Sequence, residues 1–334
     1  MSNKNRYILR EESFGGILID KEKRCCKTLS KEEFKRILNN PLPKMILVRS
    51  KKLINIKGLQ SPLTIKWGIT RKCNLNCKTC YSKKMIGKEI SKKEALKVID
   101  QLYALGIPHI IFGGGEPLCR GDFLEIVKYA TNKGFVVDID TNGILLNKRI
   151  LDKLYSMGVN RVDISLDAGD KKTNDFIRGK GTFQKIIRSI KNLKSKKFYV
   201  GVGVVVTSKN VCSLKKIVFL LNKLNVDEIH FLKFKLLGNG KINRFLCPNK
   251  SWEEIKEEIR KIKKEYPSLK IYLENSKCGV MFKTATILPE GEVTFCPLYD
   301  GIVSFGNIKR EKFLKIWERL LKQNKYRDCS FCGT

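Results

Sequence analysis

The chain has 334 residues, enough for one barrel-sized domain with small attachments. Hydrophobic residues make up 42% of it, the ordinary share for a globular protein, and its first twenty residues lack the apolar core of a signal peptide. The longest apolar run, Phe198 to Val206, is too short to cross a bilayer. We therefore expect a cytoplasmic protein without membrane attachment.

The formal net charge is +34, from 67 basic and 33 acidic residues. A surface of this kind attracts nucleic acid, anionic membrane or acidic peptides. The lysines are, however, scattered over every predicted helix, which is typical of solvated helix faces. We therefore do not favour nucleic acid as the partner.

Residues 1–60 predict a small α+β module. Tyr7–Arg10 and Gly16–Ile19 read as two short strands around a glycine-containing turn. Ser30 is a helix N-cap followed by acidic residues, and Asn40-Pro41 ends that helix.

Residues 61–235 alternate between strand and helix patterns. The predicted strands are 62–70, 109–112, 135–140, 161–166, 199–206 and 228–232. The predicted helices between them are 91–105, 123–131, 150–156, 183–193 and 213–224. Six consecutive βα units predict an α/β fold, an open partial (β/α)6 barrel resembling a TIM barrel that lacks two strands.

Residues 236–334 break this period and are expected to form a separate C-terminal unit. A charged helix is predicted over 251–266 and a further helix over 312–322. Between them, Thr284–Leu288 and Val293–Cys296 read as a β-hairpin that turns at Gly291.

Three thiols lie together directly after the first strand of the barrel. Cys73, Cys77 and Cys80 have C-x3-C-x2-C spacing in one loop, at the strand end where parallel α/β folds build their sites. Three cysteines cannot close a zinc site alone, and an iron–sulfur cube normally takes four protein ligands. They predict either a cube with one iron open to a substrate or cofactor, or a zinc site completed from elsewhere.

A second cysteine group lies in the C-terminal unit. Its members are Cys278, Cys296, Cys329 and Cys332. Four thiolates suit a closed site that holds either zinc or an iron–sulfur cluster. We expect the remaining five cysteines to be ordinary reduced thiols: Cys25, Cys26, Cys119, Cys212 and Cys247.

With the glycine-rich turn Phe112–Pro117, read as FGGGEP, the first cysteine motif resembles the signature of the radical SAM enzymes. The resemblance implies that Cys73, Cys77 and Cys80 hold a 4Fe–4S cluster whose open iron binds S-adenosylmethionine (SAM). Such enzymes cleave SAM to a 5′-deoxyadenosyl radical. The resemblance also implies an electron donor such as a ferredoxin or flavodoxin.

The candidate cofactor-binding residues follow the ends of the predicted strands. By the same resemblance, the glycine turn and Glu116 meet the amino group of SAM. We expect Asn142 and Ser165 to bind its ribose or carboxylate, and Arg178 either to bind its carboxylate or to be a surface cation. The complete set is Gly114, Gly115, Glu116, Asn142, Ser165 and Arg178.

The sequence identifies no catalytic acid or base. Asp140 and Asp167 stand at strand ends and are candidates for that role. His109 and His230 occur in apolar strands, and we expect them to be packed or supporting groups rather than metal ligands.

The four-cysteine tail is similar to the shorter, twitch form of SPASM extensions, which implies one auxiliary 4Fe–4S cluster. Residues 1–60 resemble a small peptide-recognition domain of peptide-modifying radical SAM enzymes, or form an extension that packs on the barrel. We therefore expect a maturase of a peptide or protein. One alternative is a small-molecule enzyme, for dehydrogenation or tetrapyrrole or cofactor biosynthesis. Another is a structural metal or nucleic-acid-binding protein.

Overall fold

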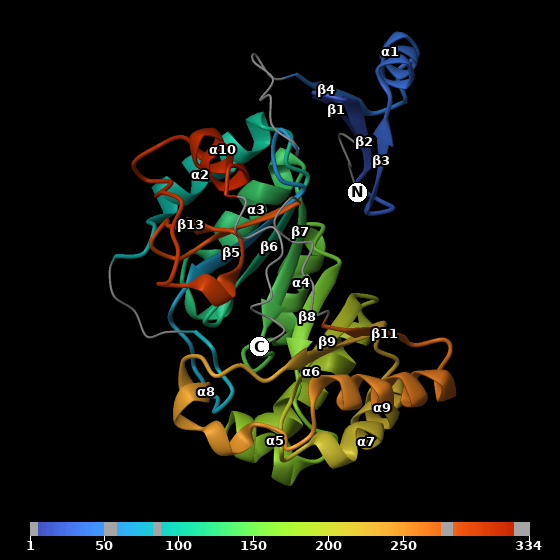
Figure 1. Ribbon diagram of the computed structural model, residues 1–334, viewed down its shortest axis with the longest axis vertical. Helices are drawn as coiled ribbons and strands as arrows, with labels where there is room; N and C mark the ends of the chain where they lie inside the picture. Colours follow the sequence, from blue (N-terminus) through green and yellow to red (C-terminus); the bar gives the residue numbers. More distant parts are fainter. Residues whose placement is uncertain (1–5, 50–58, 83–87, 275–282, 324–334) are drawn as a thin grey trace.

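The computed structural model describes residues 6–49, 59–82, 88–274 and 283–323. Within these ranges the chain forms two β-sheets, a small one near the N-terminus and a large one that organises the rest (Figure 1). No helix in the described ranges is long and apolar enough to cross a membrane.

The large sheet contains all six strands predicted for the barrel. They are β5 (Thr64–Thr70), β6 (His109–Gly114), β7 (Val136–Thr141), β8 (Arg161–Ser165), β9 (Tyr199–Val206) and β10 (Glu228–Lys233). Each pairs in parallel with the next in chain order. The two edges of the sheet do not pair with each other among the described residues, so the barrel is open there. The predicted α/β fold is confirmed.

Helices cover the outer face of this sheet (Figure 1). They are α2 (Lys92–Ala104), α3 (Phe123–Lys133), α4 (Lys148–Ser156), α6 (Thr182–Ser195) and α7 (Leu214–Lys223), while α5 (Lys171–Arg178) follows β8 and packs against α6. Strand residues that face them are buried and apolar, such as Ile65 and Trp67. The alternate residues, such as Lys66, face the concave inner side. This alternation buries one continuous core and leaves the concave side for polar groups.

Helix α5 was not expected from the sequence. Its eight residues, KKTNDFIR, are mostly polar, so the apolar period is too weak to see. Its N-cap is Asp170, whose carboxylate accepts a hydrogen bond from the Thr173 amide at 2.9 Å.

The sheet continues beyond the six predicted strands at both edges. β11 (Lys270–Leu273) pairs with β10, and β12 (Thr284–Ile287) pairs in parallel with β5. β13 (Val293–Thr294) returns antiparallel to β12, so the predicted hairpin is present and extends the main sheet. One sheet thus spans residue 236, where the sequence suggested a domain boundary. The boundaries themselves stay a prediction.

The remaining elements of the C-terminal part pack around this sheet. α8 (Asn239–Ile242), η3 (Arg244–Leu246) and α9 (Trp252–Glu265) precede β11, and η5 (Pro297–Tyr299) and α10 (Phe313–Leu321) follow β13. Trp317 of α10 is fully buried, and its indole donates to the Leu59 carbonyl at 2.9 Å. This contact fixes α10 beside the entry to β5.

The N-terminal module has a sheet of its own. Its elements are β1 (Tyr7–Glu12), β2 (Gly15–Asp20), β3 (Cys25–Leu29), α1 (Lys31–Asn39) and β4 (Met45–Val48), with strand order β3-β2-β1-β4. The predicted cap is confirmed, because Ser30 and Glu33 form a complete capping box. β3 and β4 were missed, since β3 has four exposed residues and no apolar alternation. Arg24 forms an ion pair with Asp138 of β7 at 2.7 Å, so the module packs on the barrel.

Candidate active site

The cysteine loop leaves β5 and is held closely against the glycine turn after β6. The Gly115 amide donates to the Thr70 carbonyl at 2.7 Å, and the Glu116 amide donates to the Lys72 carbonyl at 2.8 Å. A Cβ on Gly114, which has φ of 120°, would lie 2.5 Å from the Thr70 carbonyl oxygen. Backbone approach therefore requires glycine here, because no side chain fits between the two segments.

Glu116 connects this turn to the end of β7. Its carboxylate is fully buried and accepts from the Thr141 hydroxyl at 2.8 Å and from the Asn142 amide at 2.8 Å. Burial raises the pKa of Glu116, and these donors act against that rise. Because its oxygens are engaged inside the protein, Glu116 positions Asn142. A direct contact with a cofactor stays a prediction.

Asn142 in turn faces the cysteine loop. Its side-chain amide donates to Asn74 Oδ1 at 2.8 Å and lies 3.8 Å from the Cys73 sulfur. The Cys73 sulfur also accepts from the Leu75 amide at 3.5 Å. Donors that point at a sulfur are the surroundings that a metal-bound thiolate needs.

The end of α5 supports the other side of the loop. The Lys78 amide donates to the Ile177 carbonyl at 2.9 Å, and the Cys77 thiol lies 3.8 Å from the Arg178 carbonyl. Arg178 is buried, and its Nε lies 2.8 Å from Asp167 Oδ2. The sequence could not distinguish a buried from a surface Arg178, and the structure makes it a buried cation beside the thiols.

Asp167 and Ser165 have different surroundings. Asp167 is fully buried, and its Oδ1 accepts a hydrogen bond from the Val205 amide at 2.9 Å. Ser165 ends β8 on the half-exposed side of the strand, beside Gly203 of β9. Asp167 thus forms an ion pair with Arg178, and its role as a catalytic base stays a prediction.

The donor set fits an iron–sulfur cluster with three protein ligands. Burial raises the pKa of Cys77 to about 11, with the nearby Arg178 acting against it, and burial also raises the pKa of Cys73. A metal centre binds thiolates, so its binding would release protons from these thiols. Of the second cysteine group, Cys296 lies directly before η5, and Cys278, Cys329 and Cys332 lie outside the described residues.

A cavity of about 250 Å³ opens on the concave side of the sheet, below the cysteine loop. Lys66, Asp140 and Tyr81 line it together with Leu288 and Pro297 from the C-terminal part. The side chain of Asp140 is accessible from the cavity, and desolvation by the surrounding protein raises its pKa to about 7, with a further contribution from Asp163 and opposition from Lys66. Asp140 is thus a titratable carboxyl inside the cavity, which is what its predicted role as an acid or base requires.

The sequence did not indicate Arg71, which joins the cysteine loop to the C-terminal part. Its guanidinium donates to both oxygens of Glu290 at 2.9 Å and also pairs with both oxygens of Asp300. Glu290 lies in the hairpin turn and Asp300 follows η5. The sequence shows a basic residue before the cysteine motif and acidic residues more than 200 positions later, but it does not show that they pair.

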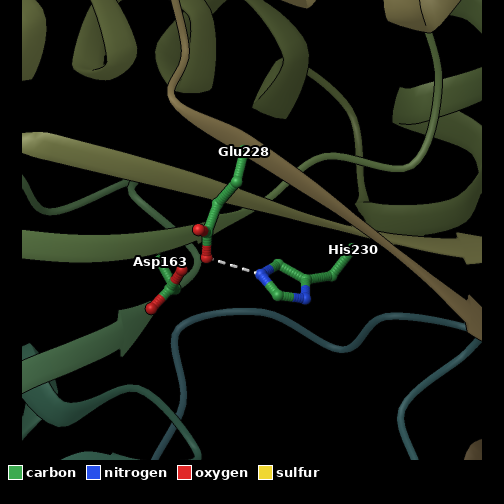
Figure 2. A group of neighbouring side chains, drawn as sticks. All are labelled: Asp163, Glu228 and His230. Carbon is green, nitrogen blue, oxygen red and sulfur yellow. Dashed lines mark hydrogen bonds and ion pairs between the residues drawn. The ribbon is translucent and has the colours of Figure 1, made fainter. Parts of the chain in front are cut away.

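A polar cluster of Asp163, Glu228 and His230, drawn in Figure 2, lies on β8 and β10, and its Asp163 pairs in register with Asp140 of β7. The His230 ring lies 2.7 Å from Glu228. Arg161 donates twice to Asp163 at 2.9 Å and also pairs with Glu228. The guanidinium supplies the positive charge that these carboxylates need, so we interpret the cluster as a salt-bridge network.

Family models match both cysteine groups. The radical SAM superfamily model matches residues 67–221, and the SPASM model, an iron–sulfur cluster-binding domain, matches residues 278–333. The Fe-coproporphyrin III synthase of Methanosarcina barkeri is 30% identical over 306 residues, which is 80% of this chain and 76% of that protein. This chain belongs to the radical SAM superfamily.

A second relative and a solved structure are also similar to this chain. The mycofactocin maturase MftC of Mycolicibacterium smegmatis is 37% identical over 161 residues, 47% of this chain and 41% of the relative. The Streptococcus suis protein SuiB bound to its precursor peptide SuiA has the same fold, with a TM-score of 0.75 at 15% identity over 98% of this chain and 92% of SuiB. The fold likeness includes the N-terminal module.

The chain is therefore a radical SAM enzyme, which uses a 4Fe–4S cluster and SAM and carries an iron–sulfur SPASM domain. This excludes the structural metal protein considered above.

Proposed function

We propose that this radical SAM enzyme matures a peptide or protein in the cytoplasm. The observation that carries the proposal is the N-terminal sheet, which presents β3 at an edge of the described structure. The first four residues of β3 are exposed. An exposed edge strand can accept an extended peptide through main-chain hydrogen bonds.

The surroundings of β3 support this use. A cavity of about 170 Å³ lies between the start of β3 and the barrel, lined by Arg24, Cys26, Leu63 and His109, among others. Arg24 is held by Asp138. A peptide added to β3 would thus be anchored to a module that is tied to the barrel.

We assign the cofactor to the mouth of the barrel. Cys73, Cys77 and Cys80 would hold the 4Fe–4S cluster, which supplies the electron for SAM cleavage when bound. The backbone of the glycine turn and Asn142 would orient SAM, with Glu116 fixing Asn142. Arg178 would hold positive charge beside the thiols, and Ser165 would face the ribose from β8.

Asp140 and Lys66 are our candidates for contact with the substrate. Both line the cavity below the cysteine loop, and the pKa of Asp140 near 7 suits a group that gains or loses a proton at neutral pH. We propose that Asp140 accepts a proton from the substrate. The positive charge of Lys66 acts against the rise in the pKa of Asp140.

We also propose one auxiliary 4Fe–4S cluster, held by Cys278, Cys296, Cys329 and Cys332. Anaerobic reconstitution should then give about eight irons per chain. The reduced thiols that these ligands require are consistent with a cytoplasmic enzyme.

A second candidate is modification of an iron tetrapyrrole. It is favoured by the relative that matches over 80% of this chain, which is an Fe-coproporphyrin III synthase. A small-molecule substrate would occupy the cavity beside Lys66 and Asp140 without using β3.

Substrate-stimulated SAM cleavage separates the two candidates. The reconstituted enzyme is given SAM and dithionite, with either the small peptides encoded beside its gene or iron tetrapyrrole carboxylates, and 5′-deoxyadenosine is measured. Stimulation by a peptide, together with a mass change of that peptide, supports maturation. Stimulation by a tetrapyrrole with none by a peptide would favour the second candidate.

A further inference from the structure

A short segment after β10 lies directly against the outer side of the cysteine loop. The Asn239 amide donates to the Cys80 carbonyl at 2.8 Å, and its side chain donates to the Cys77 carbonyl at 2.9 Å. A Cβ on Gly238 would lie 2.7 Å from the Cys80 carbonyl oxygen. Figure 1 shows α8 beside the loop that follows β5. Whatever binds this segment is therefore close to two of the cluster ligands.

The same segment exposes an unusual group of apolar side chains. Ile242 is 81% exposed, Phe245 55% and Phe176 of α5 42%. The rings of Phe176 and Phe245 meet edge to face with centroids 6.4 Å apart. Single exposed apolar residues are ordinary, but neighbouring ones from two elements are typical of a protein-binding surface.

Basic side chains surround this apolar group. Lys78 of the cysteine loop lies 4.9 Å from the centre of the Phe176 ring, and Lys241 and Arg244 are exposed. In the described part of the chain, neither Lys241 nor Arg244 forms an ion pair with a carboxylate. We call Lys78, Phe176, Lys241, Ile242, Arg244 and Phe245 the rim patch.

The sequence segments next to the rim patch are basic. Segments 71–88 and 229–252 together contain eleven basic residues and no acidic one. Arg71, Lys235 and Lys250 pair with carboxylates of other segments, whereas Lys241 and Arg244 are exposed and form no ion pair among the described residues. Elsewhere the lysines alternate with acidic residues, as in α9. Exposed basic side chains without a carboxylate partner attract an acidic protein and raise its association rate.

The position of the rim patch also argues against the substrate as its occupant. None of its residues lines the cavity below the cysteine loop. The reaction requires one electron from outside the protein, and encounters that transfer electrons use small interfaces. A compact apolar group ringed by positive charge beside the cluster loop matches that need.

We propose that the rim patch binds the acidic one-electron carrier protein, an iron–sulfur or flavin protein, that reduces the cluster. The reduced carrier loses one electron, and the cluster at Cys73, Cys77 and Cys80 gains it, with no atom transferred. The inference depends on the radical SAM activity but not on the identity of the substrate.

The test compares two reductants in charge-reversal variants. Lys241→Glu with Arg244→Glu changes the rim patch, and Lys261→Glu with Lys264→Glu makes the same charge change on α9, which leads away from α8 (Figure 1). With a reduced acidic flavodoxin or ferredoxin at low salt, we expect at least tenfold slower SAM cleavage in the rim variant and less than twofold change in the control. With dithionite, both should match the parent.

Binding is measured independently of catalysis. Titration of the cluster-free protein with oxidised flavodoxin should show at least tenfold weaker binding for the rim variant, and Phe245→Ser should weaken it without any change of charge. Carrier-dependent rates equal to the parent, or an equal loss with both reductants, would overturn the proposal. The proposal would also fail if the rim variant lost binding to RNA while it bound the carrier as tightly as the parent does. If the parent cleaves no SAM with dithionite, the result contradicts the radical SAM activity, and the binding titration still tests the docking surface.

Discussion

Replacing Arg71 with alanine should loosen the C-terminal part of the sheet. The guanidinium is nearly buried, at 11% side-chain exposure, and it holds Glu290 and Asp300, which are 14% and 12% exposed. Burial acts to lower the pKa of Arg71, but the two carboxylates outweigh it and raise the pKa above its ordinary value. The cation is therefore permanent, and its loss leaves two neighbouring carboxylates without a counter-charge.

The magnitude follows from this geometry. Removing one partner of a buried ion pair costs about 3–5 kcal/mol, because the remaining charge stays desolvated and has no counter-charge. We expect Arg71→Ala to lower the free energy of unfolding by about that amount. Arg71→Lys keeps the charge but loses the two-pronged contact, and should cost roughly half as much. Arg310→Ala, at an exposed arginine nearby, should have almost no effect.

Urea unfolding and hydrogen exchange measure the effect. The amides of β12 and β13 should lose protection first in Arg71→Ala, while those of β7 and β8 keep it. Neutralising the partners, with Glu290→Gln and Asp300→Asn in the Arg71→Ala background, should restore most of the stability. A change below 1 kcal/mol in Arg71→Ala, or no recovery on neutralisation, would refute the reasoning.

Three further outcomes are expected. Changing all three loop cysteines, Cys73, Cys77 and Cys80, to alanine should remove about four irons and abolish SAM cleavage, and retained cleavage would contradict the cluster assignment. Glu116→Gln should keep the iron content but lower both the SAM affinity and the free energy of unfolding by roughly 1–3 kcal/mol. The reason is that the charged acceptor of three hydrogen bonds is lost. Loss of iron in this variant would contradict a role of Glu116 through Asn142. The pKa of Glu228 is lowered to about 2, where burial is outweighed by His230, Tyr199 and Arg161. Its contribution of about 3 kcal/mol is therefore complete above the ordinary pKa of 4.5 and is lost as the pH falls toward 2. The stability difference between the parent and Glu228→Gln, from urea unfolding at pH 7 and pH 3.5, should narrow on acidification, and a constant difference would argue against it.

The sequence by itself determined the elements whose signals are local. The apolar alternation of residues 64–70 and the serine caps at Ser30 and Ser91 produced strands and helices at the predicted places. The spacing of Cys73, Cys77 and Cys80 needed no long-range information, because all three lie in one loop.

Only the tertiary structure decided the pairing of distant residues. Arg178 was ambiguous in the sequence, since α5 has too few apolar residues to show which face is buried, and Asp167 settles it through the fold. Glu116 looked like a free carboxylate until Thr141 and Asn142 were brought to it from the next strand. Local periodicity reports which residues are buried, whereas the partner of a buried charge depends on which strand ends the sheet places together.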